Sequence, residues 1–171
     1  MTVHCAASCV PVLIQQNVDG SNAFNRSWAE YKVGFNDTRG NYWLGNDLLS
    51  QLTLNSHLKL RFDLQLRTNF SWYWAEYSSF AVLGERYYYR LIVSGYSGNI
   101  GDALSSFHNT MMFSTYDVDN DWRSDTVQRT MAADSGTRTA MMGQLSTPFT
   151  EYSDGISRTL DGTTYRQHAC G

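Results

Sequence analysis

The chain has 171 residues, which is enough for one ordinary domain with a buried core. Its formal net charge of −3 gives no basic surface for nucleic acid, and no run of about 18 apolar residues is present that could insert into a membrane. Charged residues are sparse, at 17%, whereas aromatic residues are abundant, at 14%, a composition that suits cores, interfaces and sugar-binding surfaces alike.

Two short helices are predicted in the first third of the chain. Ser27 and Glu30 have the spacing of a capping box, so a helix should begin at residue 28, and Gly34 should end it. The aromatic residues expected on one face of this helix are Trp28, Tyr31 and Phe35. Asn46 is the expected N-cap of a second helix. That helix would carry Leu48, Leu49 and Leu52.

Antiparallel strands are predicted in the middle of the chain. Residues 58–66 alternate strictly between apolar and polar side chains, which is typical of a strand with one face in the core and one face in solvent. A second, aromatic strand is expected over residues 72–82. A third is expected over residues 87–93, with Tyr87 and Tyr89 on one side. Short helices combined with antiparallel strands predict the α+β fold class.

The chain after the third strand offers no pattern for catalysis. The glycines of residues 95–101 are expected to break the regular structure, and residues 111–113 are expected to form a buried segment. His108 is interpreted as a hydrogen-bonded structural histidine rather than a ligand or a catalytic base. No spacing of Ser, His and Asp supports nucleophilic catalysis, so the sequence predicts no enzyme and no catalytic residue.

Cysteines and glycosylation motifs indicate different compartments. The three cysteines are Cys5, Cys9 and Cys170, and an odd count leaves at least one thiol without an internal partner. We expect Cys170 to be a spare thiol or a contact to a segment that this chain lacks. Three N-glycosylation motifs begin at Asn25, Asn36 and Asn69, which favours a secreted protein. The first residues do not form a convincing signal peptide, so the start of this sequence is expected not to be the start of the complete protein.

The acidic run at residues 117–121 is the strongest candidate for a binding site. Asp117, Asp119 and Asp121 lie on alternate residues, and such a cluster of carboxylates suits calcium, which prefers hard oxygen ligands. An EF-hand is excluded because its sixth position would be Trp122 rather than Gly, and its twelfth would be Gln128 rather than Glu. From spacing alone, the run is either a different calcium loop or a solvated acidic turn.

Several ordered motifs together resemble the fibrinogen C-terminal domain family, which includes ficolins, tachylectin-like lectins, angiopoietins and tenascins. The resemblance covers roughly residues 12–125, and the acidic run falls on the calcium loop of the family. The matching segments are residues 28–35, 41–47, 60–64, 94–98, 101–104, 108–109 and 113–121, and a weaker match returns at 154–157 and 160–165.

The resemblance implies an α+β fold in which short helices flank a twisted antiparallel sheet, next to a loop-rich part that carries calcium and ligand. Residues 1–11 are expected to be a non-matching N-terminal remnant, and residues 12–171 a single domain. Within that domain, residues 12–116 would form the central sheet, and residues 117–171 would form the calcium loop and a divergent ligand-binding part.

Transferred to this chain, the Ca²⁺ ligands of the family are the side chains of Asp119 and Asp121 and the backbone carbonyls of Arg123 and Asp125. Asp117 would lie in the outer shell. The implied function is that of a secreted, innate-immune type of module that binds acetylated or acidic glycans with the support of calcium. The alternatives are a module that binds a receptor or matrix protein, as in angiopoietins and tenascins, and a partial gene product without a competent site. Homo-oligomers would form through a stem that this chain lacks.

Three departures from the family pattern concern the ligand-binding part and the ends of the chain. The opening segment of the family is missing, and the C-terminal strand that re-enters the family sheet is expected to be cut short at Gly171. Residues 126–147 contain no Cys, Trp or His, so the disulfide and the acetyl-binding pocket of the lectin members are absent. The residues that bind a ligand are therefore left unassigned, and the stretch 126–150 is interpreted as a divergent exon, a splice variant or a frame error.

Overall fold

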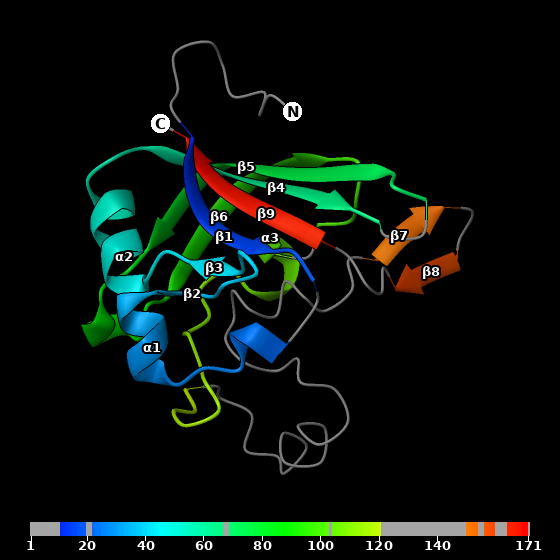
Figure 1. The fold of residues 1–171 in the computed structure, drawn as a ribbon. Helices are drawn as coiled ribbons and strands as arrows, with labels where there is room; N and C mark the ends of the chain where they lie inside the picture. Colours follow the sequence, from blue (N-terminus) through cyan, green and yellow to red (C-terminus); the bar gives the residue numbers. More distant parts are fainter. Residues whose placement is uncertain are drawn as a thin grey trace.

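The computed structural model describes residues 11–19, 22–66, 69–102, 104–120, 150–153, 156–159 and 164–170. Among these residues, seven strands form one sheet in the order β2-β3-β1-β9-β4-β5-β6, and β7 and β8 form a separate hairpin (Figure 1). Neighbouring strands of the large sheet are antiparallel. With its short helices this arrangement confirms the predicted α+β class. The strands are β1 (Val12–Asn17), β2 (Phe35–Asn36), β3 (Tyr42–Trp43), β4 (Leu58–Gln65), β5 (Trp72–Val82), β6 (Leu91–Gly98), β7 (Thr150–Ser153), β8 (Ile156–Thr159) and β9 (Thr164–Cys170), and the α-helices are α1 (Trp28–Val33), α2 (Asn46–Leu54) and α3 (Leu104–Phe107).

Helix α1 begins and ends where the sequence predicts. The Ser27 hydroxyl accepts from the backbone N–H of Glu30, and the Glu30 carboxylate accepts from the backbone N–H of Ser27 over 2.9 Å, which completes the capping box. Gly34 ends the helix with a φ of 92°, and a Cβ at this position would lie 2.7 Å from the backbone oxygen of Leu44. Only glycine fits this turn, because a side chain would both strain the backbone and collide with the segment that follows β3.

Helix α2 confirms the second predicted helix, but its N-cap is one residue earlier than expected. Gly45 is the N-cap, with a φ of 104°, and Asn46 is the first residue of the helix. The Asn46 side chain is buried, and its Nδ2 has no hydrogen-bond partner in the described part of the chain. The N-cap position of α2 makes no side-chain hydrogen bond, and glycine occupies it because φ there is positive.

Strands β4 and β5 confirm the two predicted strands of the middle region. Along β4, the buried residues Leu60, Phe62 and Leu64 alternate with partly exposed polar residues. The two strands pair in antiparallel register, with Phe62 opposite Ala75. Both apolar rows therefore face the same core.

The third predicted strand is wrong in its position. Residues 85–87 form a 3-10 turn, Tyr88 and Tyr89 have left-handed φ values of 54° and 47°, and the strand β6 begins only at Leu91. The strand then continues through Gly95 to Gly98, where a break was expected. Position 95 of the strand requires glycine, because a Cβ there would lie 1.9 Å from the Ser78 hydroxyl on β5 and collide with it. The glycine there allows close approach of two strands and does not end one.

Aromatic rings fill the space between the sheet and the helices. Tyr31 of α1 lies edge-to-face against Trp43 of β3 and Phe113, at centroid distances of 5.6 and 5.2 Å. Phe113 is buried, as predicted, whereas Met111 and Met112 are only partly buried. Edge-to-face pairs of this kind contribute about 0.5–1.5 kcal/mol each beyond the area they bury. The cluster fixes the segment around Phe113, and with it the start of the acidic loop.

The C-terminal strand bears on two predictions. Strand β9, drawn in red in Figure 1, lies between β1 and β4 and pairs with both, so the strand that was expected to be cut short at Gly171 does enter the central sheet. Cys170 is disulfide-bonded and buried, so its interpretation as a spare thiol is wrong. The other cysteines of the chain, Cys5 and Cys9, lie outside the described residues. The division of the domain into residues 12–116 and 117–171 stays a prediction. Strand β9 of the large sheet comes from the second of these parts.

Candidate functional site

We call residues 113–125, which include the acidic run, the acidic loop. Its described part, residues 113–120, is folded back on itself. Thr115 and Val118 exchange backbone hydrogen bonds, with N···O distances of 2.9 and 3.3 Å. Asn120 closes the loop: its backbone N–H donates to the Ser114 hydroxyl over 3.0 Å, and its side-chain amide donates to the carbonyl of Phe113 over 2.8 Å. The loop is therefore a compact turn anchored at the buried ring of Phe113, rather than an open acidic run.

Asp117 joins this loop to helix α1. One oxygen of its carboxylate, Oδ1, accepts from the backbone N–H of Trp28 over 2.9 Å and from the hydroxyl of Thr115 over 2.8 Å. Trp28 is the first residue of α1, where backbone N–H groups have no partner inside the helix. Asp117 therefore caps a helix that is distant in the chain. Its predicted place in the outer shell of a calcium site stays a prediction.

Of the predicted inner ligands, Asp119 is the one that the structure describes. Asp119 is an exposed residue of the loop and directly follows Val118. Asp121, Arg123 and Asp125 lie outside the described residues. Within the part of the chain that is described, no three side chains of His, Cys, Asp or Glu gather as a metal site would require. The donor set of carboxylates and backbone carbonyls consists of hard oxygens, which is the chemistry that calcium prefers.

Trp28 links the loop to a turn at residues 84–90. Its indole ring lies 5.4 Å from the Tyr89 ring and 5.8 Å from the Phe113 ring, measured between centroids. The indole N–H donates to a carboxylate oxygen of Glu85 over 3.2 Å, and the other oxygen of Glu85 forms an ion pair with Lys32 of α1. The hydrogen bond from Lys32 holds the pKa of Glu85 below its ordinary value, which keeps this carboxylate charged.

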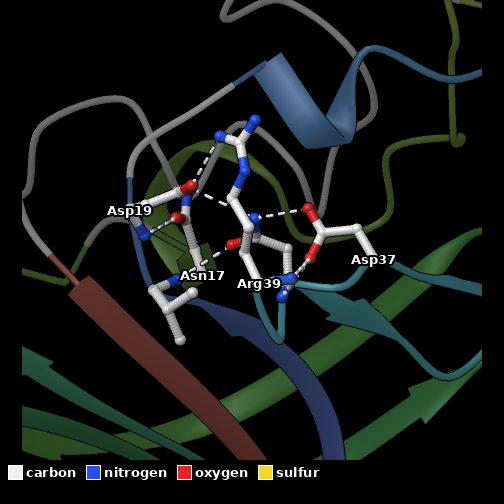
Figure 2. Close-up of polar contacts among 6 residues, drawn as sticks. Asn17, Asp19, Asp37 and Arg39 are labelled. Carbon is white, nitrogen blue, oxygen red and sulfur yellow. Dashed lines mark hydrogen bonds and ion pairs between the residues drawn. The ribbon is translucent and has the colours of Figure 1, made fainter.

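A second acidic cluster, which the sequence did not predict, joins the segment after β1 to the turn between β2 and β3 (Figure 2). The side-chain amide of Asn41 donates to Asp19 over 3.1 Å and to Asp37 over 2.8 Å, while its oxygen accepts from the backbone N–H of Val18 over 2.9 Å. Arg39 forms an ion pair with Asp19 over 2.9 Å. The side-chain hydrogen bond from Asn41 is the main reason why the pKa of Asp37 is lowered.

This cluster fastens two segments to each other and does not resemble a binding site. Both carboxylates already accept hydrogen bonds from protein donors, and the buried Asn41 uses its oxygen and its amide nitrogen within the network. The signal in the sequence is the run of residues 36–40, because Asn, Asp and Gly are typical of turns whose side chains bond to nearby backbone. That signal predicts a turn but not its distant partners, Val18 and Asp19, which follow β1.

The remaining predicted residues lie on the surface or next to α3. The glycosylation candidates Asn25, Asn36 and Asn69 are all exposed, and their modification stays a prediction. His108 follows α3 and is partly buried, and burial lowers its pKa. Its Nδ1 has no hydrogen-bond partner among the described residues, so the hydrogen bond expected for a structural histidine is not formed at that atom. In the described part of the chain, no helix combines the length and the apolar character needed to cross a membrane.

Comparison with protein families gives one match over most of the chain: "Fibrinogen beta and gamma chains, C-terminal globular domain" matches residues 3–157. Fibrinogen-like protein A of Apostichopus parvimensis is 41% identical over 109 residues, which cover 64% of this chain and 38% of that protein. Human Ficolin-3 is 40% identical over 111 residues, covering 64% of this chain and 36% of its own. Human Angiopoietin-4 is 42% identical over 109 residues, covering 64% and 22%. The chain thus spans about 22 to 38% of the length of these relatives.

Solved structures show the same fold. The fibrinogen-like globe domain of human ANGPTL2 is 25% identical and superposes with a TM-score of 0.71, covering 92% of this chain and 78% of that chain. The D-dimer of lamprey fibrin, in complex with the peptide Gly-His-Arg-Pro-amide, is 23% identical with a TM-score of 0.67, covering 96% of this chain and 62% of that chain. The architecture predicted from the sequence motifs is therefore that of a fibrinogen-like globe.

Proposed function

The chain belongs to the family of fibrinogen C-terminal globular domains, and from this premise we propose that it is an extracellular recognition module whose acidic loop binds calcium and supports lectin-like binding of acetylated or acidic glycans. Members of this family are binding modules rather than enzymes, and the relatives include a ficolin, an angiopoietin and fibrinogen chains. The observation that carries the proposal is the compact loop at residues 113–120, with Asp119 exposed beyond its turn.

In this proposal, the side chains of Asp119 and Asp121 and the backbone carbonyls of Arg123 and Asp125 hold the calcium ion. The ion supplies a fixed positive charge that keeps two nearby carboxylates from repelling each other and stabilises the loop. The hydrogen bonds of Asn120 and the tie from Asp117 to α1 hold the described half of the loop in one shape before the ion binds. Such pre-ordering reduces the entropy that binding must otherwise overcome.

A calcium titration of the thermal melt tests the metal site. A ligand that binds only the folded state stabilises it by about 2.7 kcal/mol at 100 times its dissociation constant. We expect the melting temperature to rise with calcium and to fall back with EDTA, and the variant Asp119→Asn to lose this response. Glu151→Gln, on the separate β7–β8 hairpin, changes the charge equally and should keep the response. An unsubstituted protein that melts cooperatively but ignores calcium would contradict the metal site.

Glycan binding is tested separately, on an array of acetylated and acidic sugars with and without EDTA. Binding that disappears in EDTA and in Asp119→Asn would support the lectin-like proposal. Glycan binding that persists in EDTA and in Asp119→Asn would show that calcium is not needed for it. The same array should include neutral sugars without acetyl groups, because equal binding to these would contradict the proposed ligand class.

The second candidate is a module that binds a receptor or matrix protein. Two observations favour it: an angiopoietin and two angiopoietin-related proteins are 40 to 42% identical to this chain, and residues 126–147 lack the Cys, Trp and His of an acetyl-binding pocket. A pull-down from cell-surface and matrix extracts, with no signal on the glycan array, would support this candidate. The lack of any cooperative melt would instead favour a partial gene product.

The cellular setting proposed for the chain follows from its relatives. Secretion, an innate-immune role, glycosylation at Asn25, Asn36 and Asn69, and homo-oligomers formed through a stem outside this chain are all part of the proposal. A stem would add avidity by placing several modules on one ligand surface. Expression in a secretory host, followed by removal of N-glycans, tests the glycosylation, since each used site shifts the apparent mass.

A further inference from the structure

A single side chain connects the acidic loop to the beginning of helix α1. The Asp117 Oδ1 atom accepts two hydrogen bonds, from the backbone N–H of Trp28 and from the hydroxyl of Thr115, at 2.9 and 2.8 Å. Trp28 and Asp117 are 89 residues apart in the chain. A carboxylate oxygen offers two lone-pair sites, and both are used here by protein donors. Oδ1 therefore serves to hold two segments together.

The contact also serves the helix. The Trp28 N–H is among the first backbone donors of α1, which lack partners inside the helix. A negative charge at this end also interacts favourably with the helix dipole. The capping box of Ser27 and Glu30 lies one residue earlier and orders the same turn of the helix. The first turn of α1 thus has two caps, one local and one supplied by the acidic loop.

Packing supports the same junction from a second direction. The Trp28 indole contacts Phe113, the buried anchor of the loop, and Tyr89 in the turn at residues 84–90. That turn is paired with the loop, because the backbone N–H of Phe113 donates to the carbonyl of Tyr88 over 2.8 Å. A displacement of the first turn of α1 would therefore move Asp117 and Phe113 together, and with them the segment that presents Asp119.

We propose that Asp117 is a positioning residue that couples the acidic loop to the first turn of α1, so that the order of this helix end sets the calcium affinity of the loop. The inference rests on the proposed calcium site, but it concerns residues that hold no metal themselves. Coupling of this kind is reciprocal, so calcium in the loop should also stabilise the beginning of α1. Residues that orient metal ligands from outside the ligand set typically change metal affinity about 10- to 100-fold when they are substituted.

The test measures calcium binding by isothermal titration calorimetry on the whole chain, well below the melting temperature. Asp117→Ala should weaken binding by about tenfold or more. Ser27→Ala, which removes the local cap but touches no ligand, should weaken it by about fivefold or more. Asn55→Ala is the matched control, because it removes a hydrogen bond to the Gln51 carbonyl at the end of α2 and should leave the affinity unchanged. A merely structural role of Ser27 would lower the melting temperature without changing the dissociation constant, and that result would overturn the proposal.

If Asp117→Ala does not fold, Asp117→Asn replaces it, because the amide keeps the shape and one acceptor oxygen while it removes the charge. Its calcium affinity should fall between those of the unsubstituted protein and of Ser27→Ala. Equal affinity in Asp117→Asn and the unsubstituted protein, together with unchanged affinity in Ser27→Ala, would contradict the coupling.

If the protein binds no calcium, the proposed metal site is wrong, but the coupling between Asp117 and the first turn of α1 can still be tested. Urea unfolding in EDTA of Ser27→Ala, of the Asp117 variant and of the double variant then decides. Coupled sites give a double variant whose loss differs from the sum of the single losses. Losses that add would show that the loop and α1 are independent, and would overturn the inference.

Discussion

Tyr88 and Tyr89 are adjacent in the chain, yet their side chains have opposite environments. The Tyr89 ring is 2% exposed and its hydroxyl donates to Asp47 of α2 over 2.6 Å, whereas Tyr88 is 47% exposed. Burial and the bond to Asp47 both raise the pKa of Tyr89, so it stays a neutral donor. Two consecutive left-handed residues cost roughly 1–2 kcal/mol each, and the buried ring and its hydrogen bond offset that strain.

The pair provides a matched test at the residue scale. We expect Tyr89→Phe to lower the free energy of unfolding by about 1–2 kcal/mol, because it leaves Asp47 without its donor while keeping the ring. Tyr88→Phe should change stability by less than about 0.5 kcal/mol, as most surface substitutions do. Urea unfolding of the two variants measures both values. Equal losses would show that the Asp47 bond does not stabilise the turn.

Elements with a local signal could be predicted from the sequence, and those that depend on distant partners could not. The capping box located α1, and strict alternation located β4 within a residue, because both signals lie inside the element. The tyrosines at residues 87 and 89 imitate an alternating strand, but the chain turns there to bring Tyr89 to α2. The presence of β9 depends on its pairing with β1 and β4, which no local pattern of residues 164–170 reveals.

The disulfide of Cys170 lies at the end of this central strand, so its loss should act on the whole sheet. Because β9 pairs on both sides, releasing its end exposes two ladders at once. Disulfides typically contribute about 2–4 kcal/mol, and we expect a loss of that size in urea unfolding after reduction. Cys170→Ser should show the loss without reductant and no further change with it. If thiol titration shows full reduction and the reduced protein is as stable as the disulfide-bonded protein, the prediction is wrong.

At the scale of the whole molecule, contacts between distant segments place the candidate site. The acidic run could be read from the sequence, since three carboxylates on alternate residues are a local pattern, and calcium as its ligand is a proposal. The tie from Asp117 to Trp28 could not, because it joins a loop to a helix 89 residues earlier. The same holds for the Asn41 network, whose turn is visible in the sequence while its partners after β1 are not. The fold therefore determines how the described part of the acidic loop is held.

Two histidines, the buried His168 and the partly buried His108, should make the stability of the folded protein depend on pH. His168 lies on β9 opposite Arg61 of β4; burial lowers its pKa, Arg166 and Arg61 lower it further, and Asp63 opposes them. Burial also lowers the pKa of His108. An unfolded histidine has a pKa of about 6.5, so their contribution is complete above that pH. It is lost as the pH falls from there through the lower folded values, because the unfolded chain takes up the proton first.

We therefore expect the melting temperature, measured in EDTA, to fall between about pH 7 and pH 5, before the carboxylates titrate. Glu30, Asp37 and Glu85 lose their contribution only at lower pH, because hydrogen bonds hold their pKa values below the ordinary 4.5 and 3.8. The double variant His108→Gln/His168→Gln should flatten the upper step, whereas His57→Gln, at an exposed position, should leave it unchanged. An upper step that persists in the double variant would show that other groups carry it.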